Sequence, residues 1–255
     1  MGANMIQRNY IKIDKNKWFF NTNCLVKNKK CGKLGLLVHC YLGTKPDFVN
    51  NAINTIDITL DEIYKALNIK PTNTATTKKI KDCLVKMYGS QQTVNDALKV
   101  KTRNRKFAID YIMPNDNYTK IEQDTIKTIL NADFVINKKA NLLAVYLYIC
   151  GCINTKTKYC YPSHANISKM TGISLRAVND LINILCNDLG LLYMVNPKYY
   201  IEKGKRRRSC NFYTLNEPEY IKAVDDVYNK QVDINKKFGI SYDDTNFDPF
   251  FNDFK

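Results

Sequence analysis

The sequence predicts a mainly α-helical fold with small β-hairpins (α+β), organised as two similar domains in tandem. Three observations lead to this expectation. Apolar residues recur at helical spacing in several segments. In each half, two short alternating segments flank a basic turn, which indicates a hairpin. The pattern of the second half also recurs in the first, about 104 residues earlier. The 255 residues are enough for two domains that each bury a core.

The second half of the sequence carries the stronger signals. Lys138 to Cys152 has apolar residues at helical spacing and is expected to form a helix with one apolar face. Ser163 is a helix-start signal, and Gly172 supplies the positive-φ residue that ends this short helix. Ser174 then caps another helix, which Gly190 closes. The residues of this helix expected to face the core are Val178, Leu181, Ile182 and Leu185.

A hairpin follows these helices. Leu191 to Val195 and Cys210 to Leu215 are expected to pair as strands, with Gly204 to Arg208 in the loop between them. Three helices, with a short turn between the second and third, followed by a hairpin with a basic tip, resemble the winged helix-turn-helix family over residues 134–216. The run from Tyr161 to Leu192 is the most specific part of the resemblance. The resemblance implies a DNA-binding domain.

The first half repeats this plan more faintly. Lys33 to Leu42 is expected to be its first helix, and Thr59 or Asp61 lies near the start of the next. Asn68 stands where the second half has Gly172, and the turn that follows is longer. The matched apolar pairs are Ile63 with Ile167 and Ile69 with Ile173, both 104 residues apart.

The rest of the first half is expected to form a helix and a hairpin. Thr76 to Met87 reads as the second helix of the turn, with its apolar residues inward. Leu98 to Thr102 and Phe107 to Ile112 alternate as strands, joined by the basic turn Arg103 to Lys106. The inward residues of the helix are Ile80, Leu84 and Met87.

These signals divide the chain into five parts. Between the two copies, Tyr118 to Leu130 is expected to be a connecting helix. The parts are winged-helix domain 1 (residues 1–113), a linker with the connecting helix (114–133), winged-helix domain 2 (134–216), a C-terminal helix (217–238) and an acidic aromatic tail (239–255).

The charge distribution predicts a polyanionic partner. The chain has 39 Lys and Arg against 24 Asp and Glu, a net charge of +15. Residues 217–255 carry nine acidic residues and five lysines, a net charge of −4, which leaves +19 on residues 1–216. A strongly basic body with an acidic appendage is typical of proteins that bind nucleic acid.

The exposed face of the second helix of each turn is the candidate surface for reading bases. In the second copy Ser174 caps the helix, and Leu175, Arg176, Asn179 and Asn183 are expected to face outward, the last three along one face. Arg suits a guanine edge and Asn an adenine edge. In the first copy Thr77, Lys78 and Lys81 are expected to face outward and to suit phosphates. A solvated helix face is the alternative for any single one of these residues.

The two basic turns are the candidate backbone contacts. In a winged helix this turn lies along the DNA backbone or enters the minor groove. A nuclear-localisation signal and a merely solvated turn are the alternatives for the second copy. The residues are Arg103, Arg105 and Lys106 in the first copy, and Lys203, Lys205, Arg206, Arg207 and Arg208 in the second.

The sequence offers little sign of catalysis, so we expect no enzyme activity, cofactor or metal. It has no phosphate-binding Gly-x-x-x-x-Gly-Lys-Ser/Thr motif and only two histidines. Cys150, Cys152, Cys160 and His164 invite comparison with a zinc site, but the Cys-x-Cys spacing is too close for the usual pair. We expect these cysteines to be buried, reduced thiols.

We expect a cytoplasmic protein that associates with the nucleoid of a bacterial or phage-infected cell. The longest uncharged apolar run, Leu142 to Ile153, has 12 residues, whereas a transmembrane helix needs about 20. The first residues lack the basic and apolar regions of a secretory signal. No membrane partner is therefore expected.

The tail contains four phenylalanines at helical spacing among acidic residues. These rings either pack on the protein's own body, dock a partner protein, or cover the basic surface until DNA displaces the tail. The residues are Phe247, Phe250, Phe251 and Phe254.

Two winged helices joined in one chain resemble the plasmid replication initiator proteins of bacteria. This resemblance covers about residues 10–216 and implies binding to repeated origin sequences (iterons) in double-stranded DNA, with recruitment of host replication proteins. A homodimer is a further candidate assembly. The alternatives are a winged-helix transcription regulator and a protein-interaction module of a replication or partition complex.

Overall fold

The computed structural model describes residues 10–20, 24–28, 31–45, 53–70, 72–99, 103–195, 200–202, 205–207, 211–215 and 222. These residues form a mainly helical structure with small antiparallel strand pairs, as predicted for the fold class. Within this described part, no helix is long and apolar enough to cross a membrane.

The first unit spans residues 10–112. The predicted helices at Lys33–Leu42 and Thr76–Met87 are confirmed as α1 and α3, and β2 pairs with β3 in antiparallel fashion. In chain order its elements are β1 (Tyr10–Asp14), the short helical segments η1 (Asn16–Phe20) and η2 (Leu25–Lys27), α1 (Gly32–Gly43), β2 (Ile53–Ile58), α2 (Leu60–Ala66), α3 (Thr74–Tyr88), α4 (Gln92–Lys99) and β3 (Phe107–Ile112).

The second unit spans residues 118–214. Its three predicted helices are confirmed as α6, α7 and α8, and the predicted outer strands pair as β5 and β8, with Met194 opposite Tyr213. In chain order its elements are β4 (Tyr118–Glu122), α5 (Gln123–Asn131), α6 (Ile136–Cys152), α7 (His164–Thr171), α8 (Leu175–Asn183), the π-helical segment η3 (Ile184–Asp188), β5 (Tyr193–Val195), β6 (Tyr200–Glu202), β7 (Lys205–Arg207) and β8 (Phe212–Thr214).

The 104-residue spacing holds in the structure. Helices α1 and α6 begin 104 residues apart, and so do α2 and α7. Asn68 and Gly172 both have positive φ, at 52° and 66°. In the first unit Ile56 lies opposite Ile109, and the equivalent residues of the second unit, Cys160 and Tyr213, form a β-bridge. The two units therefore share one plan of helices and strands.

The first unit departs from this plan at α4, so the strand predicted from Leu98 to Thr102 is wrong where it is described. Leu98 and Lys99 end α4, which buries Val94 and Ala97 at helical spacing. Residues 100–102 lie outside the described part of the chain. The turn from Arg103 to Lys106 therefore follows a helix and leads into β3.

Side chains near α4 occupy the edge of β3 that another strand would bond. The side-chain amide of Gln91 donates to the carbonyl of Asp110 at 3.0 Å and accepts from its N–H at 2.9 Å. The hydroxyl of Thr93 donates to the carbonyl of Ala108 at 3.0 Å. Because these bonds satisfy backbone groups on the strand edge, the helix can replace the strand that we expected.

The connecting helix predicted from Tyr118 to Leu130 is also wrong in its first part. Residues 118–122 form β4, and α5 begins only at Gln123. In β4, buried Thr119 and Ile121 alternate with outward residues, which is the period of a half-buried strand. The partner strand β1 lies more than 100 residues earlier, so local periodicity does not indicate this pairing.

The antiparallel pair β1–β4 joins the two units and is symmetric about its own centre. The strands read Tyr-Ile-Lys-Ile-Asp and Tyr-Thr-Lys-Ile-Glu, 108 residues apart, and they pair antiparallel with Lys12 opposite Lys120 at the centre. Each lysine lies over the tyrosine ring of the opposite strand: Lys12 over Tyr118 at 4.4 Å and Lys120 over Tyr10 at 4.6 Å. These cation–π contacts offset the repulsion between two lysines placed opposite each other.

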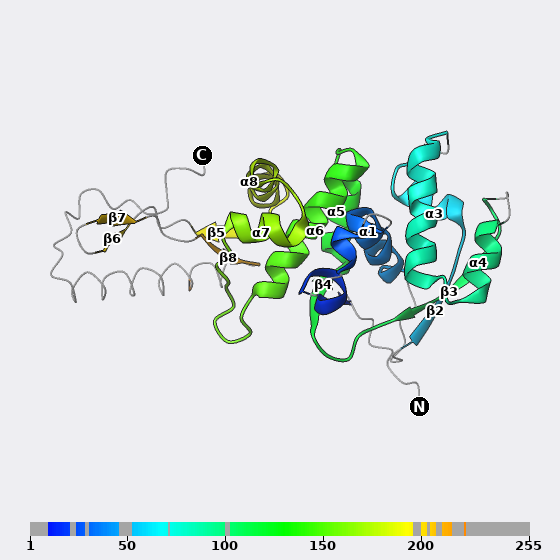
Figure 1. Ribbon diagram of the computed structural model, residues 1–255, viewed down its shortest axis with the longest axis horizontal. Helices are drawn as coiled ribbons and strands as arrows, with labels where there is room; N and C mark the ends of the chain where they lie inside the picture. The colour runs from blue at the N-terminus through cyan, green and yellow to red at the C-terminus, as the bar shows by residue number, and fades with distance from the viewer. Residues whose placement is uncertain are drawn as a thin grey trace, which may run out of the picture.

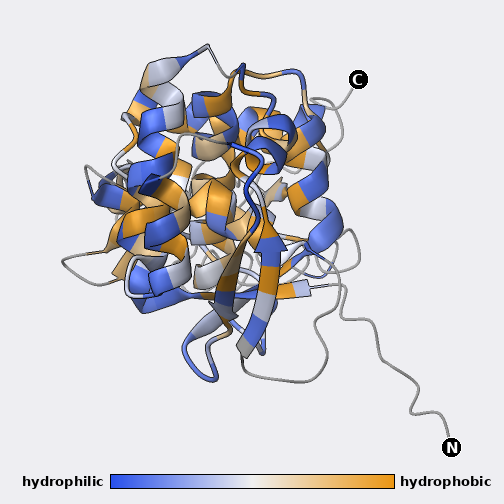
Figure 2. Ribbon diagram, turned by 90° about the vertical axis from the view of Figure 1, so that its right-hand side faces the viewer, coloured by the Kyte–Doolittle hydropathy of each residue, from blue (hydrophilic) through white to orange (hydrophobic). Residues whose placement is uncertain are grey.

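The equivalent helices α1 and α6 pack against each other between the two units, and ten of the twelve residues of α1 and eleven of the seventeen of α6 are buried. Figure 1 shows them near the middle of the molecule, with α3 and α4 toward one end and α7 and α8 toward the other. One apolar core runs through both units, and Figure 2 shows the hydrophobic segments gathered in the central helices. A helix that is apolar on all sides has to be enclosed, and here the other unit encloses it.

His39 on α1 is buried among aromatic rings of the first unit. Its Nδ1 lies 2.6 Å from the hydroxyl of Tyr88, its ring stacks on Tyr111 at 4.6 Å, and Trp18 lies 5.4 Å away. Burial, with a smaller effect of Lys17, lowers the pKa of His39 to about 3. The imidazole is therefore neutral in the folded protein at all but strongly acidic pH.

We predict that His39 makes the fold sensitive to acid. Below about pH 6.5 the unfolded chain protonates this histidine and the folded chain does not, so stability falls as the pH drops from 6.5 toward 3. The loss from this group approaches roughly 4 kcal/mol near pH 3. Urea unfolding at pH 7 and pH 4 should show a smaller difference in the free energy of unfolding for His39→Gln than for the unaltered chain. Equal differences in the two proteins would contradict this role.

Candidate nucleic-acid interface

Helices α7 and α8 form a tight helix-turn-helix whose ends are fixed by capping. The hydroxyl of Ser163 accepts from the N–H of Asn166 at 3.1 Å, and that of Ser174 accepts from the N–H of Ala177 at 3.4 Å. Between them Gly172 takes the left-handed conformation that ends α7. The hydroxyl of Ser168 also donates to the carbonyl of Ile173 at 2.6 Å, which holds the turn against α7.

The inner face of α8 is buried as predicted. Ile167 of α7 and Ile173 of the turn are also buried and join the same core, so the two helices are held at a fixed angle. The buried residues of α8 and η3 are Val178, Leu181, Ile182 and Leu185.

The outer face of α8 carries the predicted polar residues. Arg176, Asn179 and Asn183 are all exposed, and their spacing places them on one side of the helix. Ser174 is exposed at the cap. The structure thus brings Arg176, Asn179 and Asn183 together on one accessible face, which suits hydrogen bonding to base edges, while Ser174 caps the helix.

The basic segment of the second unit lies in a strand pair that we did not anticipate within the hairpin. Strands β6 and β7 pair antiparallel, so Lys205, Arg206 and Arg207 are strand residues and not loop residues. Lys203 and Arg208 lie outside the described residues.

A polar cluster that sequence reasoning missed joins this hairpin to α7. Nε2 of His164, the first residue of α7, lies 2.8 Å from the hydroxyl of Tyr213 on β8 and 2.9 Å from Nδ2 of Asn211. The ring centroids of Phe212 and Tyr161 lie 5.8 Å apart in the same region. The three polar residues come from segments 47 residues apart or more, so no local pattern announces them. The cluster fixes the hairpin base beside the start of α7.

The first unit presents its predicted cations less uniformly. On α3 Lys78 is exposed, but Thr77 and Lys81 are only partly exposed, so the expectation that all three face outward is wrong in part. The hydroxyl of Thr77 donates to the carbonyl of Thr74 on its own helix. Arg103, Arg105 and Lys106 are all exposed, and the carbonyl of Arg103 accepts from the N–H of Asp61 at the start of α2.

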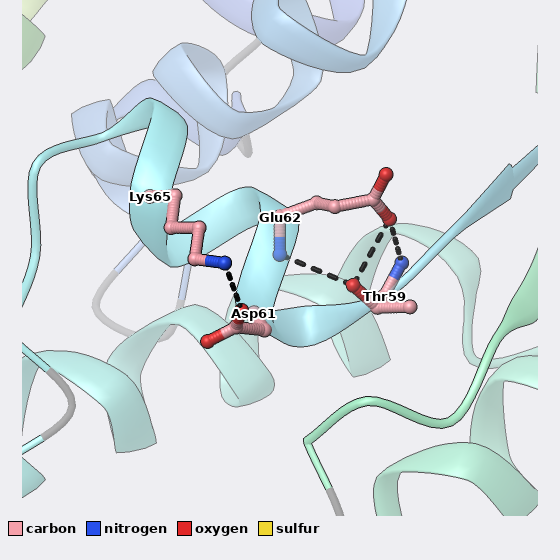
Figure 3. A network of polar contacts seen from close by, with 4 residues as sticks. All are labelled: Thr59, Asp61, Glu62 and Lys65. Atoms are coloured by element: carbon pink, nitrogen blue, oxygen red, sulfur yellow. Dashed lines mark hydrogen bonds and ion pairs between the residues drawn. The ribbon is translucent and has the colours of Figure 1, made fainter.

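A capping box occupies the start of α2 (Figure 3). The carboxylate of Glu62 accepts from the N–H of Thr59 at 2.7 Å and from its hydroxyl at 2.9 Å, while that hydroxyl accepts from the N–H of Glu62 at 3.1 Å. Desolvation raises the pKa of Glu62, but the bonds from Thr59, with Lys45 and Lys106 nearby, outweigh it and lower the pKa overall. Asp61 pairs with Lys65 at 2.9 Å. The motif Thr-x-x-Glu was a visible signal for this cap.

The two units differ in charge at the start of the first helix of each turn. The first turn of α2 contains Asp61 and Glu62, whereas the first turn of α7 contains no acidic residue. Carboxylates at a helix start neutralise its partial positive charge and repel a phosphate. Of this equivalent pair of helices, only α7 has a start without carboxylates that would repel a phosphate.

The zinc site that we considered has no counterpart among the residues described, where no cluster of three or more His, Cys, Asp or Glu side chains suits a metal ion. Burial raises the pKa of Cys150 to about 12, and burial also raises the pKa of Cys160. The thiol of Cys160 faces the carbonyl of Ile149.

Several predicted residues lie outside the described part of the chain. These are the C-terminal helix at 217–238, except Lys222, and the acidic aromatic tail with Phe247, Phe250, Phe251 and Phe254. Their predicted roles stay predictions.

Comparison with known proteins supports one part of this description. Residues 137–192 match a family model described as a helix-turn-helix domain. No curated protein and no solved structure matches the chain. The match covers α6, α7 and α8, the same helices that carry the capped turn and the exposed polar face. The chain thus contains a helix-turn-helix domain, a class of domain that typically binds DNA.

We predict that position 172 tolerates Asn better than Ala. The Cβ of Gly172→Ala would meet only Cγ of Lys27 at 3.9 Å, so its cost is the left-handed backbone, about 1 kcal/mol. Gly172→Asn should lose less free energy of unfolding than Gly172→Ala, because Asn68 takes the same conformation in the first unit. Urea unfolding measures both variants. Equal losses would contradict the equivalence of the two turns.

Proposed function

We propose that this protein binds double-stranded DNA in a sequence-specific manner, with α8 as its recognition helix in the major groove. The observation that carries the proposal is the capped α7–α8 pair inside the matched helix-turn-helix domain, with Arg176, Asn179 and Asn183 exposed on one face. The major groove, about 12 Å wide, admits such a helix. Arg forms two hydrogen bonds to guanine, and Asn does the same to adenine, so the three side chains suit direct readout of base pairs.

The hairpin of the second unit is the proposed wing. Its basic segment, Lys203 to Arg208, would lie along the phosphate backbone or enter the minor groove beside the major groove that holds α8. The contacts of His164 with Tyr213 and Asn211 support this arrangement, because they hold the hairpin base beside the acid-free start of α7. Phosphate contacts position the protein, while α8 supplies the specificity.

The first unit is the proposed second winged-helix module. It shares the 104-residue plan, and its exposed Lys78, Arg103, Arg105 and Lys106 suit phosphates. The symmetric β1–β4 pair supports two contact regions of opposite orientation on one duplex, in successive major grooves about 34 Å apart. Because the exposed cations of the first unit suit phosphates, that unit would mainly hold the backbone, and the polar face of α8 in the second unit would read bases.

We further propose a role in starting replication of a plasmid or phage at repeated origin sites, by binding and not by catalysis. The tandem arrangement and the net charge of +19 on residues 1–216 support this role. The acidic aromatic tail would contact host replication proteins, and two chains bound at neighbouring repeats would form the homodimer. The alternative function, a winged-helix transcription regulator, would use the same DNA-binding surface.

Selection of bound fragments from random DNA and from the surrounding genetic element tests these roles. Clustered repeats near an origin would support initiation, and a single promoter site would support regulation instead. A salt titration with random duplex DNA tests DNA binding itself. Absence of salt-dependent binding would overturn the proposal and favour a protein-interaction module.

We predict that the triple replacement of Arg206, Arg207 and Arg208 by Ala lowers affinity for all duplexes alike. If each arginine neutralises one phosphate, the slope of log K against log salt becomes shallower by about 3. A double variant, Lys127→Ala with Lys156→Ala, removes exposed charges outside the proposed interface and should leave the slope nearly unchanged. An unchanged slope in the triple variant would remove the wing from the interface.

We predict that Asn179→Ala changes which sequences are preferred. Losing a paired contact to adenine should reduce discrimination at one position roughly tenfold, with random-sequence affinity little affected. Asn131→Ala, at an exposed position on α5, is the control. Selection from a random library reads out the result, and an unaltered consensus would exclude Asn179 from base reading.

A further inference from the structure

One apolar side chain is exposed on the otherwise polar outer face of α8. Leu175 is 50% exposed, although it is the first residue of a helix whose other apolar residues pack inward. Exposing a leucine to water is unfavourable, and a lone exposed leucine is unremarkable elsewhere on a surface. Leu175 differs from such a residue because it lies on α8, the proposed recognition helix.

Leu175 lies at the end of α8 that enters a groove first. In helix-turn-helix proteins the N-terminal residues of the recognition helix approach the base edges. Leu175 follows the Ser174 cap directly, precedes Arg176 in the chain, and lies one turn before Asn179 on the same side. A side chain here meets the floor of the major groove together with its two polar neighbours.

We propose that Leu175 is a specificity-determining residue that contacts the 5-methyl group of thymine. This inference rests on the proposed DNA-binding function and deepens it. The thymine methyl is the apolar group that base pairs present in the major groove, and apolar side chains recognise it. Contact between the two removes both from water, which recovers the cost of leaving Leu175 exposed.

The neighbouring residues favour the same kind of target. Asn179 and Asn183 suit adenine, and Leu175 suits thymine, so three positions on one face favour A·T pairs while Arg176 favours a G·C pair. At the equivalent position of the first unit, counted from the helix cap, stands Thr74. The smaller side chain of Thr74 reaches less far than leucine, in keeping with a unit that mainly holds phosphates.

The test uses the full chain and uracil, which lacks the methyl group and keeps the pairing edge of thymine. Duplexes are first selected from a random library, and each thymine of the preferred site is then replaced singly by uracil. With the unaltered chain, one or two replacements should weaken binding about fourfold each, the effect of one buried methyl. The variant Leu175→Ala should bind the thymine site about fourfold more weakly than the unaltered chain. Replacing thymine by uracil should then cause no further loss of affinity.

Two variants make the result specific. Val135→Ala truncates another exposed apolar residue, at the start of α6, and should keep the uracil sensitivity. Leu175→Met keeps an apolar side chain of similar size and should keep it as well. Tight, selective binding that is insensitive to every uracil replacement, or sensitivity that persists in Leu175→Ala, would overturn this inference and leave the proposed function standing. Failure to select any duplex would overturn both.

Discussion

The packing of α1 against α6, together with the β1–β4 pair, is the contact on which the remaining structure depends. Both helices are apolar on nearly all sides, so each needs its own unit on one side and the other unit on the other. The shared core then positions the helices that follow, since α7 and α8 pack on α6 and α3 packs on α1. The candidate interface is therefore held by a rigid centre that neither unit supplies alone.

Strong local signals allowed much of the fold to be predicted. Caps at Ser163 and Ser174, and the left-handed Gly172, mark helix ends through bonds within a few residues, so the sequence alone locates α7 and α8. The strand β4 and the helix α4 were missed for the opposite reason. The strand β4 depends on its distant partner β1, and α4 depends on bonds from Gln91 and Thr93 to the edge of β3.

The candidate site was predictable to the extent that it follows helical periodicity. Knowing which residues of α8 are buried leaves Arg176, Asn179 and Asn183 outside, and the structure agrees. The contacts of His164 with Tyr213 and Asn211 were not predictable, because they join residues far apart in the chain. Partial burial of Thr77 and Lys81 likewise depends on neighbours that a single helix pattern does not include.

The symmetric pair β1–β4 lies within one polypeptide, and this has a consequence for how the protein responds to dilution. Two separate chains joined by such a contact would dissociate at low concentration, because association depends on the concentration of both chains. Covalent linkage replaces that dependence by a high and constant effective concentration of one half around the other. The paired arrangement therefore persists at a few copies per cell, and each half is free to change its sequence without matching a second, identical subunit.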